Sequence, residues 1–134
     1  MIIKTTPDRE KAESILKMVN TTLEMIQTID SHKFPSHITK EYYDVIRELL
    51  SISLLLEGYK TVGEGAHKEL IEHFTNHDIG LSQSDLTVID KLRTIRNRIS
   101  YDGFFVTNDY LERNKKTFLS IINKLKKMVG SKLQ

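Results

Sequence analysis

The stretch that decides the fold is YYDVIRELLSISLLL, which runs from Tyr42 to Leu56. Its apolar residues recur at intervals of three and four, the spacing that places side chains on one face of an α-helix. The apolar stripe is also wide, because further apolar residues fill the positions beside it. We therefore expect a helix buried on more than one side, either central in the core or carrying a dimer surface as well. Its apolar positions are Tyr42, Val45, Ile46, Leu49, Leu50, Ile52, Leu54, Leu55 and Leu56.

The first two helices have recognisable start and stop signals. Thr6 followed by Pro7 is typical of a helix start, so the first helix is expected over about residues 7–31. Lys33-Phe34-Pro35-Ser36 should end it, because the residue before a proline disfavours helix. Thr39 is the expected cap of the second helix, and Gly63-Glu64-Gly65 is its expected end.

The second half of the chain repeats the helical spacing in three more segments. No strand pattern of any length appears, so we predict an all-α fold, an antiparallel four-helix bundle plus one short helix. A chain of 134 residues is long enough for one domain, which we expect to span 1–134 with a core of about 7–129. A short helix is expected over 66–76, followed by a loop at Asp78-Ile79-Gly80. Ser82 or Ser84 is the expected cap of the next helix, which should end at Asp102-Gly103. A connector, Phe104-Phe105-Val106, should fold onto the core, and the last helix should have Asn108 as its cap and end at Gly130.

The composition narrows the class of protein. Hydrophobic residues make up 39% and charged residues 28% of the chain, as in globular rather than disordered proteins. The absence of cysteine excludes disulfides, thiolate metal sites and a cysteine nucleophile. The longest apolar run, around Ile52–Leu56, is too short to span a bilayer, and Met1–Thr5 is too short for a signal peptide. We expect a soluble, cytoplasmic protein without a membrane partner.

Charge is distributed unevenly along the chain. Residues 1–90 carry 9 basic and 15 acidic side chains, whereas residues 91–134 carry 11 basic and 3 acidic ones. A basic C-terminal third suits phosphates or an acidic partner. The alternative is that acidic and basic helices lie side by side and neutralise one another.

The stretch LRTIRNRISYDG, Leu92 to Gly103, is the most informative about function. Ile89, Leu92, Arg96 and Ile99 step by three, four and three, so Arg96 lies on the apolar face of its helix. A guanidinium there needs either a partner or an open pocket. One interpretation is an anion site, and the other is an ion pair with a carboxylate of the second helix, such as Asp44 or Glu48.

Several polar residues surround Arg96 and form the candidate site. Arg98 is two residues from Arg96, so the two side chains diverge by about 200° and only one of them points inward. His67 opens the short helix and either reaches the Arg96 cleft or forms a hydrogen bond at the helix start. The candidate catalytic residues are Arg96, Asn97 and Tyr101, and the candidate ligand-binding residues are Arg93, Arg96, Arg98, Ser100 and His67.

Other kinds of site have weak signals. There is no Gly-x-Ser-x-Gly and no glycine-rich phosphate loop. His73 and His77 lie four residues apart, near His67 and Glu69, but zinc usually takes three or four ligands and no His-Glu-x-x-His is present. We therefore expect neither a metal nor a cofactor.

The chain resembles a HEPN domain, the helical-bundle family named for higher eukaryotes and prokaryotes nucleotide-binding. The resemblance covers about residues 7–129. Three parts carry it: the second helix ending in Leu55-Leu56-Glu57-Gly58-Tyr59 and followed by His67, the motif Leu92-Arg93-x-x-Arg96-Asn97-Arg98-Ile99-x-Tyr101-x-Gly103, and a basic closing helix over 110–128. Arg96 matches the family's motif arginine and Asn97 the polar residue after it. The family's histidine is replaced, and its place falls at Tyr101, or at Ser100 or Asp102 if the spacing is counted differently.

The resemblance implies a function and partners. In the family, the motif arginine and histidine of two protomers meet at a dimer cleft, and many members are metal-independent ribonucleases paired with a nucleotidyltransferase-type antitoxin. It therefore implies a homodimer that binds RNA or a nucleotide phosphate around Arg96, in a toxin–antitoxin setting with such a partner. The alternatives are a metal-independent ribonuclease with Arg96, Asn97 and Tyr101, and a non-catalytic dimerisation or scaffold module.

Overall fold

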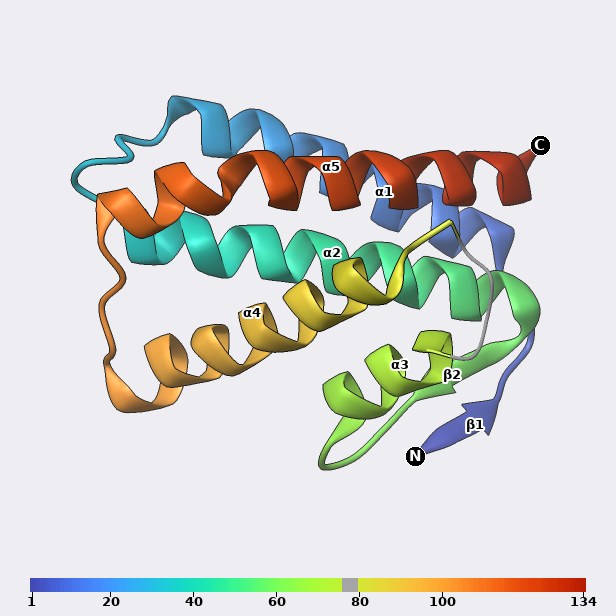
Figure 1. The fold of residues 1–134 in the computed structure, drawn as a ribbon. Coiled ribbons are helices and arrows are strands. Elements are labelled where there is room, and N and C mark those ends of the chain that lie inside the picture. Colours follow the sequence, from blue (N-terminus) through green and yellow to red (C-terminus); the bar gives the residue numbers. More distant parts are fainter. Residues whose placement is uncertain (76–79) are drawn as a thin grey trace.

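The computed structural model describes residues 1–75 and 80–134, and these are mostly helical. Residues 76–79 lie outside the described part, so the loop expected at 78–80 is largely untested. Figure 1 shows four long helices, one short helix and a small two-stranded sheet. The elements are β1 (Ile2–Lys4), α1 (Arg9–Thr28), α2 (Pro35–Glu57), β2 (Tyr59–Thr61), α3 (Ala66–Thr75), α4 (Gln83–Asp102) and α5 (Asn108–Leu133).

Helix α2 lies at the centre of the core, as the width of its apolar stripe predicts. Helices α1, α4 and α5 all pack against it, and successive long helices run in opposite directions in Figure 1. Of the nine apolar positions in the opening stretch, all except Leu56 are buried. Helix α1 adds Ala12, Val19 and Ile26, and α5 adds Leu111, Phe118, Ile121, Ile122, Leu125 and Val129.

The starts of α1 and α2 differ from those expected. Asp8, not Thr6, caps α1, with its side chain accepting from the backbone N–H of Lys11 at 3.0 Å. The preceding Thr5 is held away from the helix, because its N–H donates to the carbonyl of Gly58 at 2.8 Å. Helix α2 begins at Pro35 rather than at Thr39, since a proline suits the first helical position. Thr39 is buried inside α2, where its hydroxyl donates to the Pro35 carbonyl.

Gly58 ends α2 five residues before the expected stop. It adopts a left-handed conformation with φ of 87°, which favours glycine. A Cβ at this position would lie 3.1 Å from the carbonyl oxygen of Thr5 and 3.3 Å from Cγ of Pro7. The turn therefore needs glycine both for its backbone and for the close approach of the chain entering α1.

The small sheet is a feature that the sequence pattern did not predict. β1 and β2 pair antiparallel, with Ile2 opposite Thr61 and Lys4 opposite Tyr59. Each strand has only three residues, which is too short for a period-two pattern to stand out. Through this pairing the start of the chain lies beside β2, the segment that connects the end of α2 to α3.

The second half of the chain follows the prediction more closely. Helix α3 begins at Ala66 as expected and is described to Thr75, so its expected end at residue 76 lies outside the described residues. Ser82 caps α4 in a capping box with Asp85. The end of α4 is Gly103, with φ of 64°. Of the expected connector, Val106 is buried and its N–H donates to Ser36 on α2, whereas Phe105 is 80% exposed.

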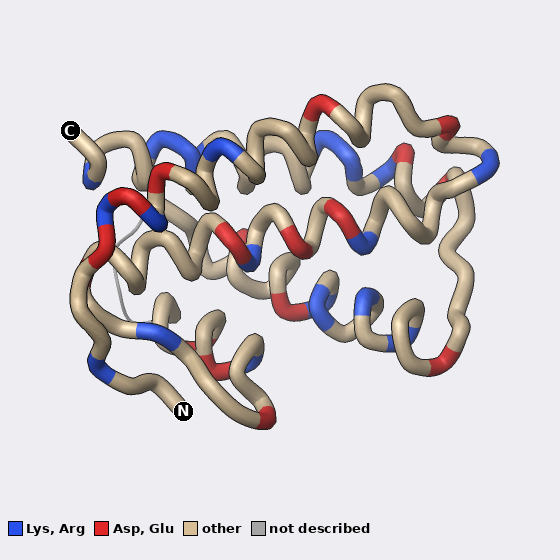
Figure 2. The backbone as a smooth tube through the Cα atoms, turned by 180° about the vertical axis from the view of Figure 1, so that it is seen from behind, with Lys and Arg blue, Asp and Glu red and all other residues tan. Residues whose placement is uncertain are grey.

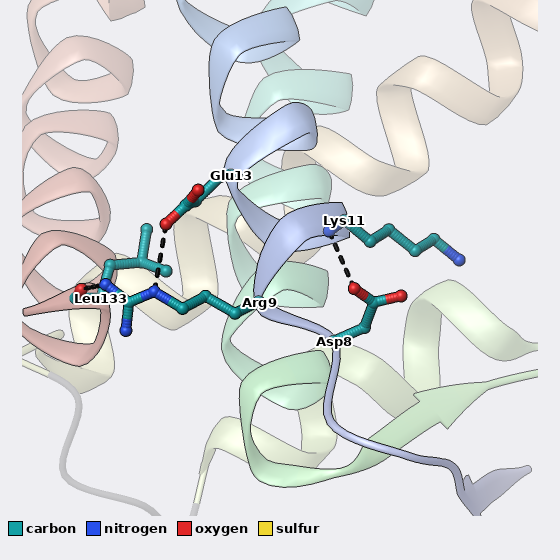
Figure 3. A network of polar contacts seen from close by, with 5 residues as sticks. All are labelled: Asp8, Arg9, Lys11, Glu13 and Leu133. Carbon is teal, nitrogen blue, oxygen red and sulfur yellow. Dashed lines mark hydrogen bonds and ion pairs between the residues drawn. The ribbon is translucent and has the colours of Figure 1, made fainter.

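Helix α5 differs at both ends from the expectation. Thr107 is its cap, and Asn108 is its first residue. Gly130 does not end the helix, which continues to Leu133. Figure 3 shows why the last turn is held: Arg9 on α1 donates to the carbonyl of Leu133 and forms an ion pair with Glu13 at 3.1 Å. No helix among the described residues is long and apolar enough to cross a membrane.

Two glycine substitutions should have opposite effects on stability. Gly58→Ala should lower the free energy of unfolding by about 2 kcal/mol, because alanine is strained at positive φ and its Cβ would crowd Thr5. Gly130→Ala is the matched control, since it lies within α5 with no atom within 4 Å of a new Cβ, and it should raise stability by about 0.5–1 kcal/mol. Urea unfolding followed by circular dichroism measures both, and a Gly58→Ala protein as stable as the wild type would contradict the analysis of this turn.

Candidate functional site

Arg96 is directed from α4 toward α2. Its side chain is 19% exposed, and its Nη2 lies 3.7 Å from Oδ1 of Asp44. The guanidinium carbon lies 6.0 Å from the centre of the Tyr43 ring, within range of a cation–π contact. Its Nη1 also donates to Oδ1 of Asn97 at 3.4 Å. Of the two interpretations of this arginine, the ion pair with Asp44 is therefore present in the folded chain.

Asp44 is shared between two guanidiniums. Nε of Arg47, on the same helix, lies 3.9 Å from Oδ1 of Asp44, and its Nη2 lies 3.8 Å from Oε1 of Glu48. These distances are ion pairs but exceed hydrogen-bond length. Accordingly, Oδ1 of Asp44 and both Nε atoms are buried without a hydrogen-bond partner among the described residues. We call Asp44, Arg47, Glu48 and Arg96 the Asp44 cluster.

Ion pairs in and around the Asp44 cluster join basic residues of 91–134 to acidic residues of 1–90. Figure 2 shows acidic and basic positions along α2, with several basic positions on the neighbouring α4. Arg93 of α4 pairs within its own helix, with Nε 3.1 Å from Oδ1 of Asp90. Lys124 of the basic α5 lies 2.8 Å from Asp85 of α4. Part of the basic charge is thus neutralised by neighbouring acids, as one of the two sequence interpretations expected.

Tyr43 and His67 form the boundary between the cluster and α3. Their ring centres lie 6.0 Å apart. Burial, which outweighs the nearby guanidiniums, raises the pKa of Tyr43 to about 12, so its phenol stays protonated. Burial, followed by the charges of Arg47 and Arg96, lowers the pKa of His67 below its ordinary value. The imidazole is therefore mainly neutral at pH 7 and can accept a proton.

A surface cavity of about 330 Å³ lies between α4 and the start of α3, and we call it the α3–α4 hollow. Arg93, Asn97 and Tyr101 are spaced by four residues, so they project from one face of α4. Across from them lie the Gly63–Gly65 turn and the first residues of α3. The full lining is Gly63, Glu64, Gly65, Ala66, His67, Lys68, Arg93, Asn97 and Tyr101.

The lining of the hollow favours an anion. Two cations line the hollow, Lys68 and Arg93, of which Arg93 also pairs with Asp90 outside the lining. Among the described residues, Glu64 is the one carboxylate in the lining. The first turn of α3 forms part of the wall, and the positive end of its helix dipole adds to the attraction. Asn97 and Tyr101, whose side chain is 77% exposed, supply an amide and a phenol for hydrogen bonds. This set of groups can hold a phosphate.

The structure brings together four of the candidate residues, namely Arg93, Asn97, Tyr101 and His67, in the hollow. Arg96 is outside the lining but touches it through Asn97. Arg98 and Ser100 are exposed and line no part of the hollow. The guanidinium of Arg98 instead lies 3.9 Å from the ring centre of Phe104, so Arg96 is the inward member of the pair, as the spacing predicts.

Lys68 and the wall formed by Gly63–Gly65 are not among the site residues predicted from the sequence. Lys68 directly follows His67, so the position of His67 at a helix start is the signal that could have found it. Of the metal candidate, only His77 lies outside the described residues. Within residues 1–75 and 80–134, no group of three or more histidine, aspartate or glutamate side chains could hold a metal ion.

Comparisons with protein-family models, with curated proteins and with solved structures found no match to this chain. The chemistry of the α3–α4 hollow is therefore the main basis for a functional proposal. That chemistry consists of two cations, a neutral imidazole, an amide and a phenol around an open space. The Asp44 cluster lies beside it and holds α4 against α2.

Removing the shared carboxylate should be costly. Asp44→Asn leaves two guanidiniums without their common acid, so we expect a loss of about 1–3 kcal/mol in the free energy of unfolding. Asp90→Asn is the matched control, because Asp90 also pairs with an arginine of its helix but is 53% exposed; it should cost at most about 0.5 kcal/mol. Chemical denaturation measures both.

Adding Arg96→Met to Asp44→Asn should restore part of the lost stability, since it removes a cation left without its partner. If Asp44→Asn costs no more than Asp90→Asn, the cluster does not hold the two helices together.

Proposed function

We propose that this chain is a HEPN-like domain that binds RNA or a nucleotide through a phosphate held in the α3–α4 hollow, beside Arg96. The observation that carries the proposal is the convergence of Arg93, Asn97 and Tyr101 on His67 and Lys68 across that hollow. A guanidinium and an ammonium suit phosphate oxygens, and the amide and phenol can donate hydrogen bonds to them. The exposed ring of Tyr101 can also stack on a base, which is how many single-stranded ligands are held.

Arg96 has an indirect role in this proposal. Its ion pair with Asp44 holds α4 on α2, and its hydrogen bond to Asn97 helps to orient the amide toward the hollow. Arg96 is therefore a positioning residue rather than the main phosphate ligand. This differs from the arrangement that the family resemblance implies, in which the motif arginine lies in the cleft itself.

The architecture supports the HEPN-like part of the proposal. Four long helices alternate in direction, and the Arg-Asn motif lies near the end of the fourth helix of the chain. An antiparallel four-helix bundle, a homodimer with the hollow at its cleft and a nucleotidyltransferase-type antitoxin belong to the same proposal. They come from the resemblance, and the hollow is compatible with a ligand that contacts two protomers, because it opens at the surface.

Binding of a short single-stranded RNA should depend on the cations of the hollow. Arg93→Gln and Lys68→Gln should each weaken binding about five- to twentyfold, since each removes one phosphate contact. The dependence of affinity on salt concentration should become shallower by about one unit of slope per lost contact. Fluorescence anisotropy with a labelled RNA, at several salt concentrations, measures both effects.

Lys91→Gln is the matched control for this experiment. Lys91 is exposed on the same helix as Arg93 and carries the same charge, but it does not line the hollow. Its substitution should change RNA affinity less than twofold. Equal losses of RNA affinity in Lys91→Gln and Arg93→Gln, or no salt-sensitive RNA binding by the wild type, would contradict this proposal. The remaining function would then be a structural module held by the Asp44 cluster.

A second candidate function is a metal-independent ribonuclease, which the position of His67 favours. The family's motif histidine is replaced by Tyr101 on α4, but His67 supplies an imidazole from α3 in the same hollow. Its lowered pKa leaves it neutral at pH 7, the form needed to take a proton from a ribose 2′-hydroxyl. The 2′-oxygen would then form a bond to the adjacent phosphorus while the bond from phosphorus to the 5′-oxygen breaks, and the departing 5′-oxygen would take a proton from water. The products would be a 2′,3′-cyclic phosphate and a 5′-hydroxyl, with Arg93 and Lys68 stabilising the charge.

RNA cleavage in the presence of a chelator tests this candidate. The rate should increase as the pH rises through the pKa of His67, which burial and the charges of Arg47 and Arg96 lower, because the base must be unprotonated. His67→Gln should reduce the rate at least about a hundredfold and remove that pH dependence. Lys91→Gln should cleave like the wild type, whereas cleavage that persists in His67→Gln would exclude His67 as the base.

A further inference from the structure

A second cavity, of about 260 Å³, also touches His67. It shares Ala66 and His67 with the α3–α4 hollow, and its other lining residues are different. Four elements surround it, and each contributes a basic or imidazole side chain: Lys11 from α1, Arg47 from α2, Lys60 from β2 and His67 from α3. Among residues 1–75 and 80–134, no aspartate or glutamate lines this cavity. A concave site with several cations and no acid favours a negatively charged occupant.

These cations are incompletely paired. Both ion pairs of Arg47 are longer than hydrogen bonds, at 3.9 Å to Asp44 and 3.8 Å to Glu48, and its buried Nε has no hydrogen-bond acceptor among the described residues. The structure records no ion pair for the side chains of Lys11 and Lys60 within residues 1–75 and 80–134. Figure 3 shows Lys11 extending from α1 away from Arg9 and Glu13. An anion in the cavity would supply the missing acceptors.

The rest of the lining is apolar or hydroxyl-bearing. Leu54 and Leu70 are buried core residues whose side chains reach the cavity, and Ser51 and Thr61 add hydroxyls. The volume is below the 300–1,000 Å³ that is common for drug-sized ligands, so the occupant is small. An inorganic ion would leave the leucines unused, which favours an anion with a short apolar body.

We propose that this cavity binds a small organic carboxylate, either aliphatic or aromatic. The carboxylate lies against the guanidinium of Arg47, which is planar and suits two parallel hydrogen bonds, while Lys11 and Lys60 neutralise it at the cavity edge. The apolar body packs on Leu54 and Leu70. The proposal does not rest on RNA binding, because RNA is proposed to bind in the α3–α4 hollow.

Benzoate is a suitable probe, with benzyl alcohol as its neutral analogue and inorganic phosphate as an anion without an apolar body. Two-dimensional amide NMR should show saturable shifts with millimolar benzoate, concentrated in Tyr59–Thr61, Ser51 and the start of α3. Neither benzyl alcohol nor phosphate should produce them. Lys11→Gln and Lys60→Gln should each weaken benzoate binding about fivefold, whereas Lys17→Gln, on the same helix as Lys11 but outside the cavity, should not.

A space-filling substitution separates a built cavity from general attraction to cations. Ser51→Leu adds volume to the lining without altering any charge, so it should abolish the benzoate shifts. If Ser51→Leu does not fold, Lys60→Gln still decides the matter, because Lys60 is exposed on β2. Unsaturable shifts, equal shifts with phosphate, or unchanged binding in both lysine variants would overturn the proposal. RNA binding measured on the same samples reports separately on the α3–α4 hollow.

Discussion

One carboxylate, Asp44, is shared by two guanidiniums where α4 packs on α2, and its ion pair with Arg96 joins the two helices. Because α2 is buried along most of its length, it has little room for polar contacts, and Asp44 lies where α4 brings Arg96 against it. Arg47 approaches the same oxygen from within α2. Neither guanidinium donates a hydrogen bond to Oδ1 of Asp44, so the attraction between the charges, rather than bond geometry, holds them. Their combined field reaches His67, where it outweighs Asp44 and acts with burial to keep the imidazole neutral.

The elements of the fold were predictable where the signal is local and repeated. The wide stripe of α2 predicted its central burial, and the capping box at Ser82 marks the start of α4 in the sequence itself. The errors occurred where a local signal had a tertiary competitor. Thr39 has the chemistry of a cap, yet its hydroxyl turns back to Pro35 inside α2. The expected stop of α2 was Gly63-Glu64-Gly65, whereas the helix ends at Gly58, whose carbonyl accepts from the N–H of Thr5.

The candidate site was predictable only in part, for a related reason. Helical spacing alone places Arg96 inward, and complementary charge made Asp44 a natural partner. The wall opposite Arg93 belongs to α3, whose position depends on the β1–β2 pairing and on the turn that follows it. Those strands join residues almost sixty positions apart, and no periodicity in the chain encodes such a pairing. For the same reason, a cavity assembled from Lys11, Arg47 and Lys60 cannot be seen in the sequence.

His67 lines two separate spaces, and this has a thermodynamic consequence. An anion in either space favours the protonated imidazole, and the resulting positive charge then attracts an anion in the other space. Occupants of the two spaces are therefore linked, and the linkage is reciprocal: each must change the affinity of the other by the same factor. A proton is the third participant, so the degree of cooperativity between the two spaces should itself vary with pH.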